Sequence, residues 1–294
     1  MHPIELLDNK SEVLTYNVTD MPMKLGKSGG KDSRIRSMVN HWHNDFEFTY
    51  ISSGEMSYCV NGLQIRLSEG QMIFVNSARM HYNFWDEHEN GDFICTIFHP
   101  SMLDRRAAEK YLDRIIGDKT PPYIVFHPEI LREKKIIDLV LRLHEKAALQ
   151  GDGYELGVMS CVYEISLALM EYMEASADPV PYSSKKLEAM HRMVGFVQQK
   201  YSERISLADI AAAGFVSRTV CCEIFRKYAN RTPVEYLTEY RISRSADLLS
   251  SGDLSITEIA SLCGFGGSSY FTETFRKIMN CTPTEFRQRN RPGI

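Results

Sequence analysis

The chain has 294 residues, of which 44% are hydrophobic and 24% charged, and its formal net charge is −4. This is the composition of an ordinary soluble chain that is long enough for two domains. We expect neither a membrane span nor a secretory signal, because no apolar run approaches bilayer length, and therefore a cytoplasmic protein. The seven cysteines are odd in number and lack metal-finger spacing, which argues against a disulfide framework.

The charge is divided unevenly along the chain. From residue 185 onward there are 16 Lys/Arg and 11 Asp/Glu, a balance of +5, whereas the preceding residues carry 18 and 27, a balance of −9. A basic C-terminal part beside an acidic N-terminal part is expected when a DNA-reading module is joined to a domain that does not bind DNA. A chance asymmetry of solvated surfaces would give the same numbers, so charge alone does not decide.

Short strands are predicted in the N-terminal third of the chain. Over residues 56–67, apolar and polar residues alternate on either side of Asn61-Gly62, the dipeptide of a type I′ hairpin. Further strands are expected over 72–75 and 93–98, with turn residues between them. Many short strands with regularly spaced turns indicate a small β-barrel or jelly roll.

Among these strands lies the pattern His41-x-His43-x-x-x-Glu47, followed later by His81. On a strand with a side-chain period of two, positions 41, 43 and 47 share one face, and His81 can join them inside a barrel. The pattern resembles the paired motifs of cupin domains. Four positions depart from the cupin pattern: Ile35, Asn76, Ala78 and Trp85.

Two uses of this cluster remain open. Three imidazoles and one carboxylate suit a divalent Zn, Fe, Mn or Ni ion, with His41, His43, Glu47 and His81 as ligands. Alternatively, the cluster lines a pocket for a small polar effector and requires no cofactor. Aromatic side chains on the same strands suit a sugar ring, although aromatics at strand spacing are commonly core residues. The predicted effector-binding residues are His41, His43, Glu47, Tyr58, His81 and Trp85.

The middle of the chain is predicted to be helical. The spacing of apolar residues indicates one helix over 102–116 and a helix pair over 130–149 and 154–173. A segment rich in Pro and Ser follows and is interpreted as a linker. The predicted domains are a sensing and dimerisation domain at 1–175, a linker at 176–184 and a DNA-binding domain at 185–294.

Residues 205–289 contain one short sequence twice. Each copy is predicted to begin with a capped helix, Ser206 with Asp209 in the first and Ser255 with Glu258 in the second. A glycine that adopts the left-handed conformation, a buried Phe and a second helix are then expected. We align Gly214-Phe215 with Gly264-Phe265, so that the offset is 49 residues up to the Ile-Ala pair and 50 from the Gly-Phe onward. Helix, glycine turn and helix make a helix-turn-helix, and there are two.

This duplicated stretch resembles the AraC/XylS family of bacterial transcription regulators. The resemblance rests on the repeat, on Arg241 to Leu249 in the linking helix, and on Gly264 to Phe271 at the second recognition helix. Asn230 and Asn280 replace a common Gly, which is mild because Asn also tolerates a left-handed helix end. The family implies that the helix pair at 130–173 makes a homodimer contact; an open alternative is that the pair only covers the barrel.

The resemblance also implies which residues meet DNA, because the second helix of each unit enters the major groove. The predicted DNA-binding residues are Arg218, Thr219, Cys222, Glu223, Arg226, Ser268, Ser269, Thr272, Glu273 and Arg276. The two arginines at 226 and 276 suit phosphate, and the two glutamates can accept from cytosine N4. Alternatively, each glutamate pairs with the arginine three residues later and touches no base. The Cys221-Cys222 pair is interpreted as packing rather than as a redox sensor.

We therefore expect an α+β protein: a cupin-like β-barrel or jelly roll with a helical pair, joined to an all-α domain with two helix-turn-helix motifs. Its expected function is transcription regulation, as an activator that binds double-stranded DNA and RNA polymerase and responds to a small polar effector such as a sugar. Two alternatives stand beside it. One is a metal-dependent cupin enzyme or metal sensor fused to a DNA-binding domain, and the other is a constitutive regulator whose barrel is filled.

Overall fold

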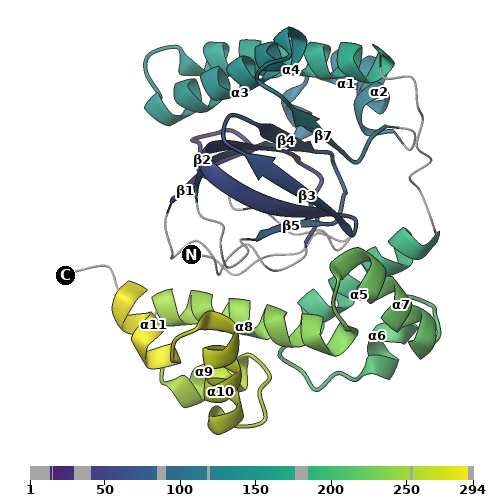
Figure 1. The fold of residues 1–294 in the computed structure, drawn as a ribbon, viewed down its shortest axis with the longest axis vertical. Helices are drawn as coiled ribbons and strands as arrows, with labels where there is room; N and C mark the ends of the chain where they lie inside the picture. Colours follow the sequence, from purple (N-terminus) through teal and green to yellow (C-terminus); the bar gives the residue numbers. More distant parts are fainter. Residues whose placement is uncertain are drawn as a thin grey trace.

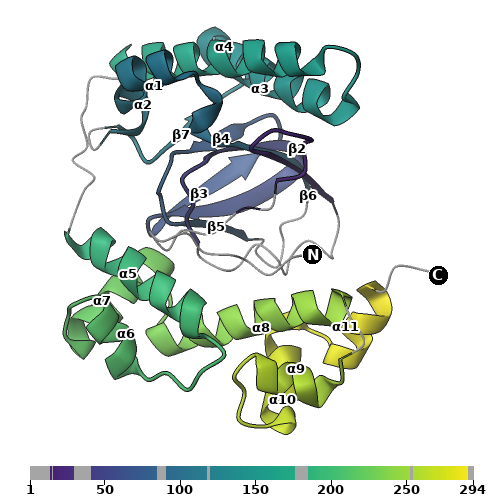
Figure 2. The same ribbon diagram turned by 180° about the vertical axis from the view of Figure 1, so that it is seen from behind.

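The computed structural model describes residues 14, 16–29, 41–84, 91–117, 120–175, 185–251 and 254–290 of the chain. Within these ranges a β-rich N-terminal part carries helices on one face, and an all-helical C-terminal part lies on its other side (Figures 1 and 2). The α+β class is thus confirmed. The predicted linker at 176–184 and the candidate residue Trp85 lie outside the described residues.

The described part of the N-terminal region contains seven antiparallel strands: β1 (Met23–Gly29), β2 (Phe46–Val60), β3 (Leu63–Ser68), β4 (Met72–Val75), β5 (His81–Phe84), β6 (Gly91–Phe98) and β7 (Tyr123–Phe126). Their order is β1-β6-β2-β4-β7, and β3 and β5 both pair with β2. The long strand β2 joins two halves, since its beginning pairs with β4 and β6 and its end with β3 and β5. A register shift between Ile51 and Ser53 and the left-handed Gly54 (φ 72°) lie between these halves. The sheet therefore folds over on itself as an open barrel.

The hairpin between β2 and β3 turns as the sequence predicts. Asn61 and Gly62 both have positive φ, 50° and 84°, which the type I′ turn requires. Gly70 (φ 85°) supplies the left-handed residue of the next turn.

The two faces of the folded sheet have separate cores. On the outer face, Phe46, Phe48, Phe74 and Phe98 form an aromatic cluster that the helices cover. The inner face carries the apolar residues Ile51, Met56, Tyr58, Val60, Leu67, Ile73 and Val75. Because side chains alternate along β2, the buried polar residues Glu47 and Thr49 lie on the side opposite Phe46 and Phe48.

The prediction of one continuous helix over 102–116 is wrong. The segment contains three short helices: η2 (Pro100–Met102), α1 (Arg105–Tyr111) and α2 (Asp113–Ile116). Asp104 causes the first break, because its carboxylate accepts the backbone N–H groups of Arg106 and Ala107 and starts α1 there. The second break, at Leu112, has no side-chain cap. The predicted pair is confirmed as α3 (Leu131–Leu149) and α4 (Tyr154–Ala175), which pack together above the sheet (Figure 1).

Helix α4 departs from the expectation that no segment is apolar enough to span a membrane. By length and composition alone it qualifies, with a hydropathy of 1.3, and it is the one such helix among the described residues. Its residues Val158, Val162, Ile165 and Leu169 are fully buried in the core shared with α3 and the sheet. In this fold it is a core helix with an apolar outer side.

The described C-terminal part contains seven helices: α5 (Lys185–Lys200), α6 (Leu207–Ala213), α7 (Arg218–Ala229), α8 (Pro233–Ser251), α9 (Ile256–Leu262), α10 (Ser268–Met279) and α11 (Pro283–Asn290). The first unit is α6 and α7, the second is α9 and α10, and α8 connects them (Figure 2). Each unit has its own core, around Phe225 in the first and Phe275 in the second. Both predicted capping boxes form, and Asn230 and Asn280 take the left-handed helix ends (φ 52° and 54°).

The alignment of the two copies through their Gly-Phe dipeptides is wrong by one residue. Gly214 has φ −82°, whereas Phe215 has φ 55° and so occupies the position of Gly264 (φ 75°). The backbone bonds agree, because Val216 N–H donates to Ala211 O as Phe265 N–H donates to Ala260 O. The extra residue of the second copy therefore lies just before α10, and Phe215 is 82% exposed rather than buried.

Candidate DNA-binding face and effector site

Helix α7 has a buried side and a polar side. The buried side carries Cys221, Ile224, Phe225, Tyr228 and Ala229. All five residues predicted to contact DNA lie off that side, half-buried in one case and exposed in the others: Cys222, Arg218, Thr219, Glu223 and Arg226. Ser217 caps the helix by accepting the N–H of Val220. The core therefore fixes which residues the helix offers to a partner.

The contacts of α7 bear on two alternatives raised for this helix. The carboxylate of Glu223 lies 3.9 Å from the ammonium of Lys186 on α5, so its ion pair is not with Arg226. Both partners are more than half exposed, and such a pair contributes little and exchanges readily. Burial, followed by the neighbouring Cys222, raises the pKa of the Cys221 thiol to about 11, which favours packing over redox sensing.

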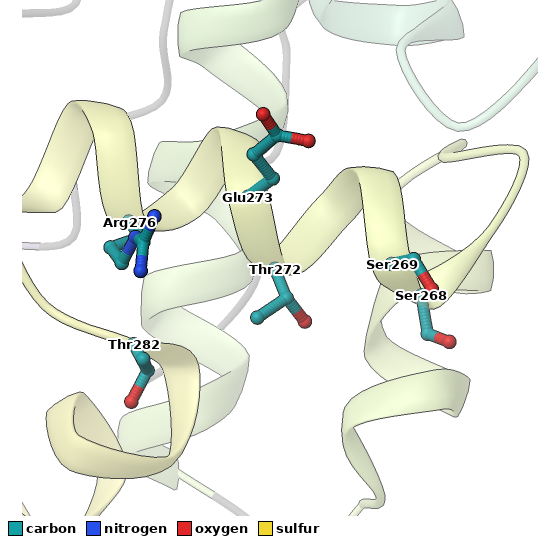
Figure 3. A pocket seen from close by; sticks show the side chains of 6 residues that line it. All are labelled: Ser268, Ser269, Thr272, Glu273, Arg276 and Thr282. Atoms are coloured by element: carbon teal, nitrogen blue, oxygen red, sulfur yellow. The ribbon is translucent and has the colours of Figure 1, made fainter.

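Helix α10 presents the equivalent surface of the second unit. Five predicted residues line a surface hollow of about 420 Å³, and Thr282, which was not predicted, completes it: Ser268, Ser269, Thr272, Glu273, Arg276 and Thr282 (Figure 3). The hollow faces away from the buried Phe271, Phe275 and Met279. Among the described residues no ion pair joins Glu273 to Arg276, so this carboxylate is available to a partner. Thr282 is found only because the N-terminus of α11 folds beside α10.

The beginning of α10 is more open than the beginning of α7. Its N-cap is Gly267, which provides no side-chain hydrogen bond, and a Cβ added at Gly266 or Gly267 would meet no atom within 4 Å. Tyr270 in the first turn is 60% exposed. Unsatisfied N–H groups at a helix start attract anionic groups such as phosphate, and neither glycine has a side chain that would block the approach.

The four residues of the cupin-like pattern are brought together by the fold. One nitrogen or oxygen of each of His41, His43, Glu47 and His81 lies within 4.8 Å of the others, and all but His41 are buried. The Nε2 atoms of His43 and His81 lie 3.4 and 3.2 Å from the same oxygen of Glu47. A backbone bridge between His41 and His81 holds the two segments side by side.

Glu47 is the centre of this cluster. Burial alone would raise the pKa of Glu47, but the charges and hydrogen bonds of His81 and His43 hold it well below its ordinary value. On its other side Tyr58 donates a 2.6 Å hydrogen bond to the second carboxylate oxygen. Burial and the charge of Glu47 raise the pKa of Tyr58 well above its ordinary value, so Tyr58 remains a neutral donor. The cluster therefore offers one anionic acceptor surrounded by donors.

The protonation of His81 follows from its second contact. Its Nδ1 lies 2.8 Å from the carbonyl oxygen of Arg79, and since a carbonyl only accepts, Nδ1 carries a proton. Nε2, which faces Glu47, then either carries a second proton or presents a lone pair. In the first case the ring forms an ion pair with Glu47, and in the second it is oriented as a metal ligand.

Two further residues belong to the cluster and were not predicted. The Asp45 carboxylate lies 3.8 Å from Nδ1 of His43, and the hydroxyl of Tyr16 donates a 2.8 Å hydrogen bond to Asp45. At this distance Asp45 does not accept a hydrogen bond from His43, and its carboxylate adds a second negative charge beside the imidazole. Asp45 was detectable, since it continues the period-two face of 41, 43 and 47. Tyr16 carries no such signal, because its contact depends on the path of residues far along the chain.

Two family profiles match the chain. Residues 210–289 match the helix-turn-helix domain and residues 34–97 match the cupin domain. Together with two recognition helices on one connecting helix, these matches define a DNA-binding transcription regulator with a cupin-type N-terminal domain. The chain belongs to the AraC/XylS family.

Relatives that match along most of the chain are regulators, not enzymes. The HTH-type transcriptional regulator YdeC of Bacillus subtilis is 26% identical over 287 residues, covering 96% of this chain and 97% of the relative. The HTH-type transcriptional activator RhaS of Salmonella paratyphi B is 22% identical over 253 residues, covering 84% and 87%. The fold is similar to ToxT of Vibrio cholerae bound to an unsaturated fatty acid, with a TM-score of 0.51, 14% identity and coverage of 93% and 97%. The protein is thus a regulator rather than an enzyme.

Proposed function

We propose that this regulator is a cytoplasmic transcription activator that reads DNA through α7 and α10 and is controlled by a small polar effector bound at the Glu47 cluster. The observation that carries the proposal is the pairing of two exposed recognition faces with one buried polar cluster in the same chain. We propose that the chain consists of a sensing and dimerisation domain at 1–175, a linker at 176–184 and a DNA-binding domain at 185–294.

DNA reading is expected to combine two kinds of contact. Arg226 and Arg276 follow the recognition faces toward the ends of α7 and α10, where a guanidinium meets phosphate. Thr272, Ser268 and Glu273 face the hollow in which base edges would lie. Phosphate contacts set affinity and its salt dependence, while the hollow sets sequence preference.

The test is a selection of duplexes from a random DNA pool by the full-length protein, followed by anisotropy titrations at several salt concentrations. We expect enrichment of a two-part sequence and a steep loss of affinity as salt increases. Thr272→Ala should relax the preference at one position, whereas Thr238→Ala, at a half-buried threonine of α8, should not. Binding that is independent of salt would contradict the proposal.

The cluster favours a polar effector, in contrast to the fatty acid bound in ToxT. Glu47 accepts and Tyr58 donates, so a molecule with hydroxyl groups, such as a sugar, can replace their mutual hydrogen bond. An apolar ligand would leave the buried carboxylate without its partners, which costs free energy.

Thermal melts of the full-length protein with a panel of sugars, polyols and fatty acids test this proposal. A true effector at 100 times its Kd should stabilise the fold by about 2.7 kcal/mol. Glu47→Gln should abolish the shift, while Glu129→Gln, an exposed change after β7, should keep it. A shift with fatty acids alone would contradict a polar effector.

A divalent metal is the second candidate for the same cluster. The donor set of three imidazoles and one carboxylate fits, and the Arg79 carbonyl already orients His81 with Nε2 toward Glu47. A bound ion would supply a Lewis-acidic anchor for an effector oxygen. His41, His43, Glu47 and His81 would hold it.

Metal content distinguishes the two candidates. Protein purified from metal-supplemented medium should contain about one metal ion per chain by mass spectrometry if the cluster is a metal site. His43→Gln and His81→Gln should each remove it, and His127→Gln, outside the cluster, should not. Metal-free protein that still responds to a sugar would exclude the metal.

A homodimer through the outer side of α4 is also proposed, as is a contact with RNA polymerase during activation. Leu156 is 79% exposed, Leu167 53% and Tyr163 37%, and they lie on one side of α4 at helical spacing. Leu156→Glu should shift the sedimentation of the protein from dimer to monomer, with Leu149→Glu on α3 as the control. A monomeric wild-type protein would contradict the dimer. The activator role is tested by transcription in vitro with RNA polymerase, which the protein should increase from a promoter next to its selected duplex.

A further inference from the structure

The N-terminal barrel contacts the first helix-turn-helix unit directly beneath the Glu47 cluster. Residues 41 and 43 belong to the cluster, whereas Trp42 between them is 5% exposed and packs into the core of the first unit. In the same way, Met80 before His81 is fully buried in that core. Neighbouring side chains along an extended backbone face opposite ways, so one short stretch serves both the cluster and the unit.

The contact with α5 is a ring stack. The indole of Trp42 lies on the imidazole of His191, with ring centroids 4.6 Å apart and an interplanar angle of 24°. Around it lie the fully buried Met190, Met193 and Val194 of the same helix. A stacked pair within an apolar shell has a defined geometry, so a tilt of the indole moves α5.

A second contact reaches the end of the recognition helix itself. A Cβ added at Gly62, in the β2–β3 turn, would lie 1.7 Å from the carbonyl oxygen of Lys227 in the last turn of α7. The turn is tied to the stretch before His81, because Asn61 N–H donates to Met80 O and Met80 N–H donates to the Asn61 side chain. Hydrogen bonds thus connect the cluster's backbone to the turn, and the turn packs closely against the last turn of α7.

The second unit has no equivalent contact among the described residues. Its core is built from α8, α9, α10 and α11 with Tyr201, and none of the barrel's described core residues belongs to it. The second unit is joined to the first through α8 and through the end of α5, because a Cβ added at Gly264 would lie 2.5 Å from the carbonyl oxygen of Tyr201.

We propose that Trp42, Met80 and Gly62, with His191 and Lys227, form a latch that transmits the state of the Glu47 cluster directly to the first helix-turn-helix unit, and to the second only through the first. This inference rests on the proposed function and names its regulation. An occupant that draws His41, His43 and His81 together shifts the same backbone that carries Trp42 and Met80, and so changes the position of α7 relative to α10. Coupling of this kind requires two arrangements that the occupant stabilises differently.

The first part of the test follows docking with the chain's own fluorescence. The chain has two tryptophans, so Trp85→Phe leaves Trp42 as the single reporter. In the full-length Trp85→Phe protein, we expect acrylamide to quench Trp42 weakly, and His191→Ala to increase the quenching constant about threefold. His127→Ala, a histidine after β7, is the matched control. Equal quenching with and without His191 would overturn the docking.

The second part is a double-mutant cycle on DNA affinity, measured on a duplex selected from the random pool. Glu47→Gln perturbs the cluster and His191→Ala breaks the latch. We expect Glu47→Gln to change the Kd about tenfold when the latch is intact and less than about twofold when it is broken. If Glu47→Gln unfolds the barrel, as a thermal melt would show, His43→Gln takes its place.

Three results decide. Non-additive effects support the latch. Equal effects of Glu47→Gln in both backgrounds, or no effect in either, overturn it although DNA binding persists. If the wild-type protein selects no duplex from the random pool, the proposed function itself fails. This outcome is distinguishable from failure of the latch, because the fluorescence of Trp42 still measures the docking.

Discussion

The two helix-turn-helix units share one design but differ in what holds them. The first begins α7 with a serine cap, bends through the left-handed Phe215 and packs against the barrel through Trp42. The second bends through Gly264, begins α10 with an uncapped glycine and has a core made without the barrel's described core residues. The duplicated units thus differ in their surroundings, since among the described residues only the core of the first includes residues of the barrel.

The largest effect is expected for Gly264→Ala, at the turn of the second unit. A Cβ there would lie 2.5 Å from Tyr201 O, and the residue has φ 75°, so both space and backbone oppose it. We expect a loss of about 2–4 kcal/mol in the free energy of unfolding, measured in urea. Gly266→Ala, where a Cβ meets no atom within 4 Å, should change it little; equal losses would show that the turn is not constrained.

The next prediction concerns the pH sensitivity of the first unit. Burial, with Arg79 and Arg192 nearby, lowers the pKa of His191 from 6.5 to about 4. Between these pH values His191 takes up a proton in the unfolded chain and not in the folded chain. The contribution of His191 to the free energy of unfolding is therefore highest above pH 6.5 and decreases as the pH falls toward 4. We expect a loss of about 2 kcal/mol between pH 7 and pH 4.5, allowing for partial exposure. His191→Gln should flatten that part of the curve and His127→Gln should not.

Arg226→Ala and Arg276→Ala compare the two units on DNA. Each should weaken binding about fivefold to tenfold and reduce the salt slope by about one, because each removes one phosphate contact. The measurement is anisotropy between about 50 and 200 mM salt on the selected duplex. A change in sequence preference with an unchanged salt slope would instead assign that arginine to a base.

The smallest expected effect is at Phe215. A non-glycine residue in the left-handed region is strained, and Asn tolerates that region better than Phe. Because Phe215 is 82% exposed, Phe215→Asn loses little packing and should raise the free energy of unfolding by about 0.5 kcal/mol. Val216→Asn is the contrasting change, since Val216 packs on the first core and should lose stability. A loss at 215 would mean that the phenyl ring has a packing role, for example with Arg192, whose guanidinium lies 5.2 Å from it.

Features that depend on neighbours in sequence could be predicted, and those that depend on distant segments could not. The caps at Ser206 and Ser255, the Asn61-Gly62 turn and the face shared by residues 41, 43 and 47 follow from local rules. The docking of Trp42 on His191 does not, since an aromatic residue between two histidines reads equally as barrel core or as outer surface.

The misplaced insertion in the repeat shows a subtler limit. Gly-Phe occurs in both copies, and similarity of letters favoured aligning the dipeptides. Backbone geometry instead aligns Phe215 with Gly264, because the left-handed position is set by the hydrogen bonds that close α6 and α9. The broken segment at 102–116 has a similar lesson: Asp104 begins a helix that apolar spacing alone would have run through.

Helix α8 sets the distance between the two recognition helices by its length. It spans 19 residues, Pro233 to Ser251, which corresponds to about 28 Å, close to one turn of the double helix. Adding or removing one residue would rotate α10 about the axis by about 100° and aim it away from the groove. Regulators with this architecture can therefore recognise different base sequences by changing the exposed residues of α7 and α10. The distance between the two halves of the operator stays the same, because the helix α8 is rigid.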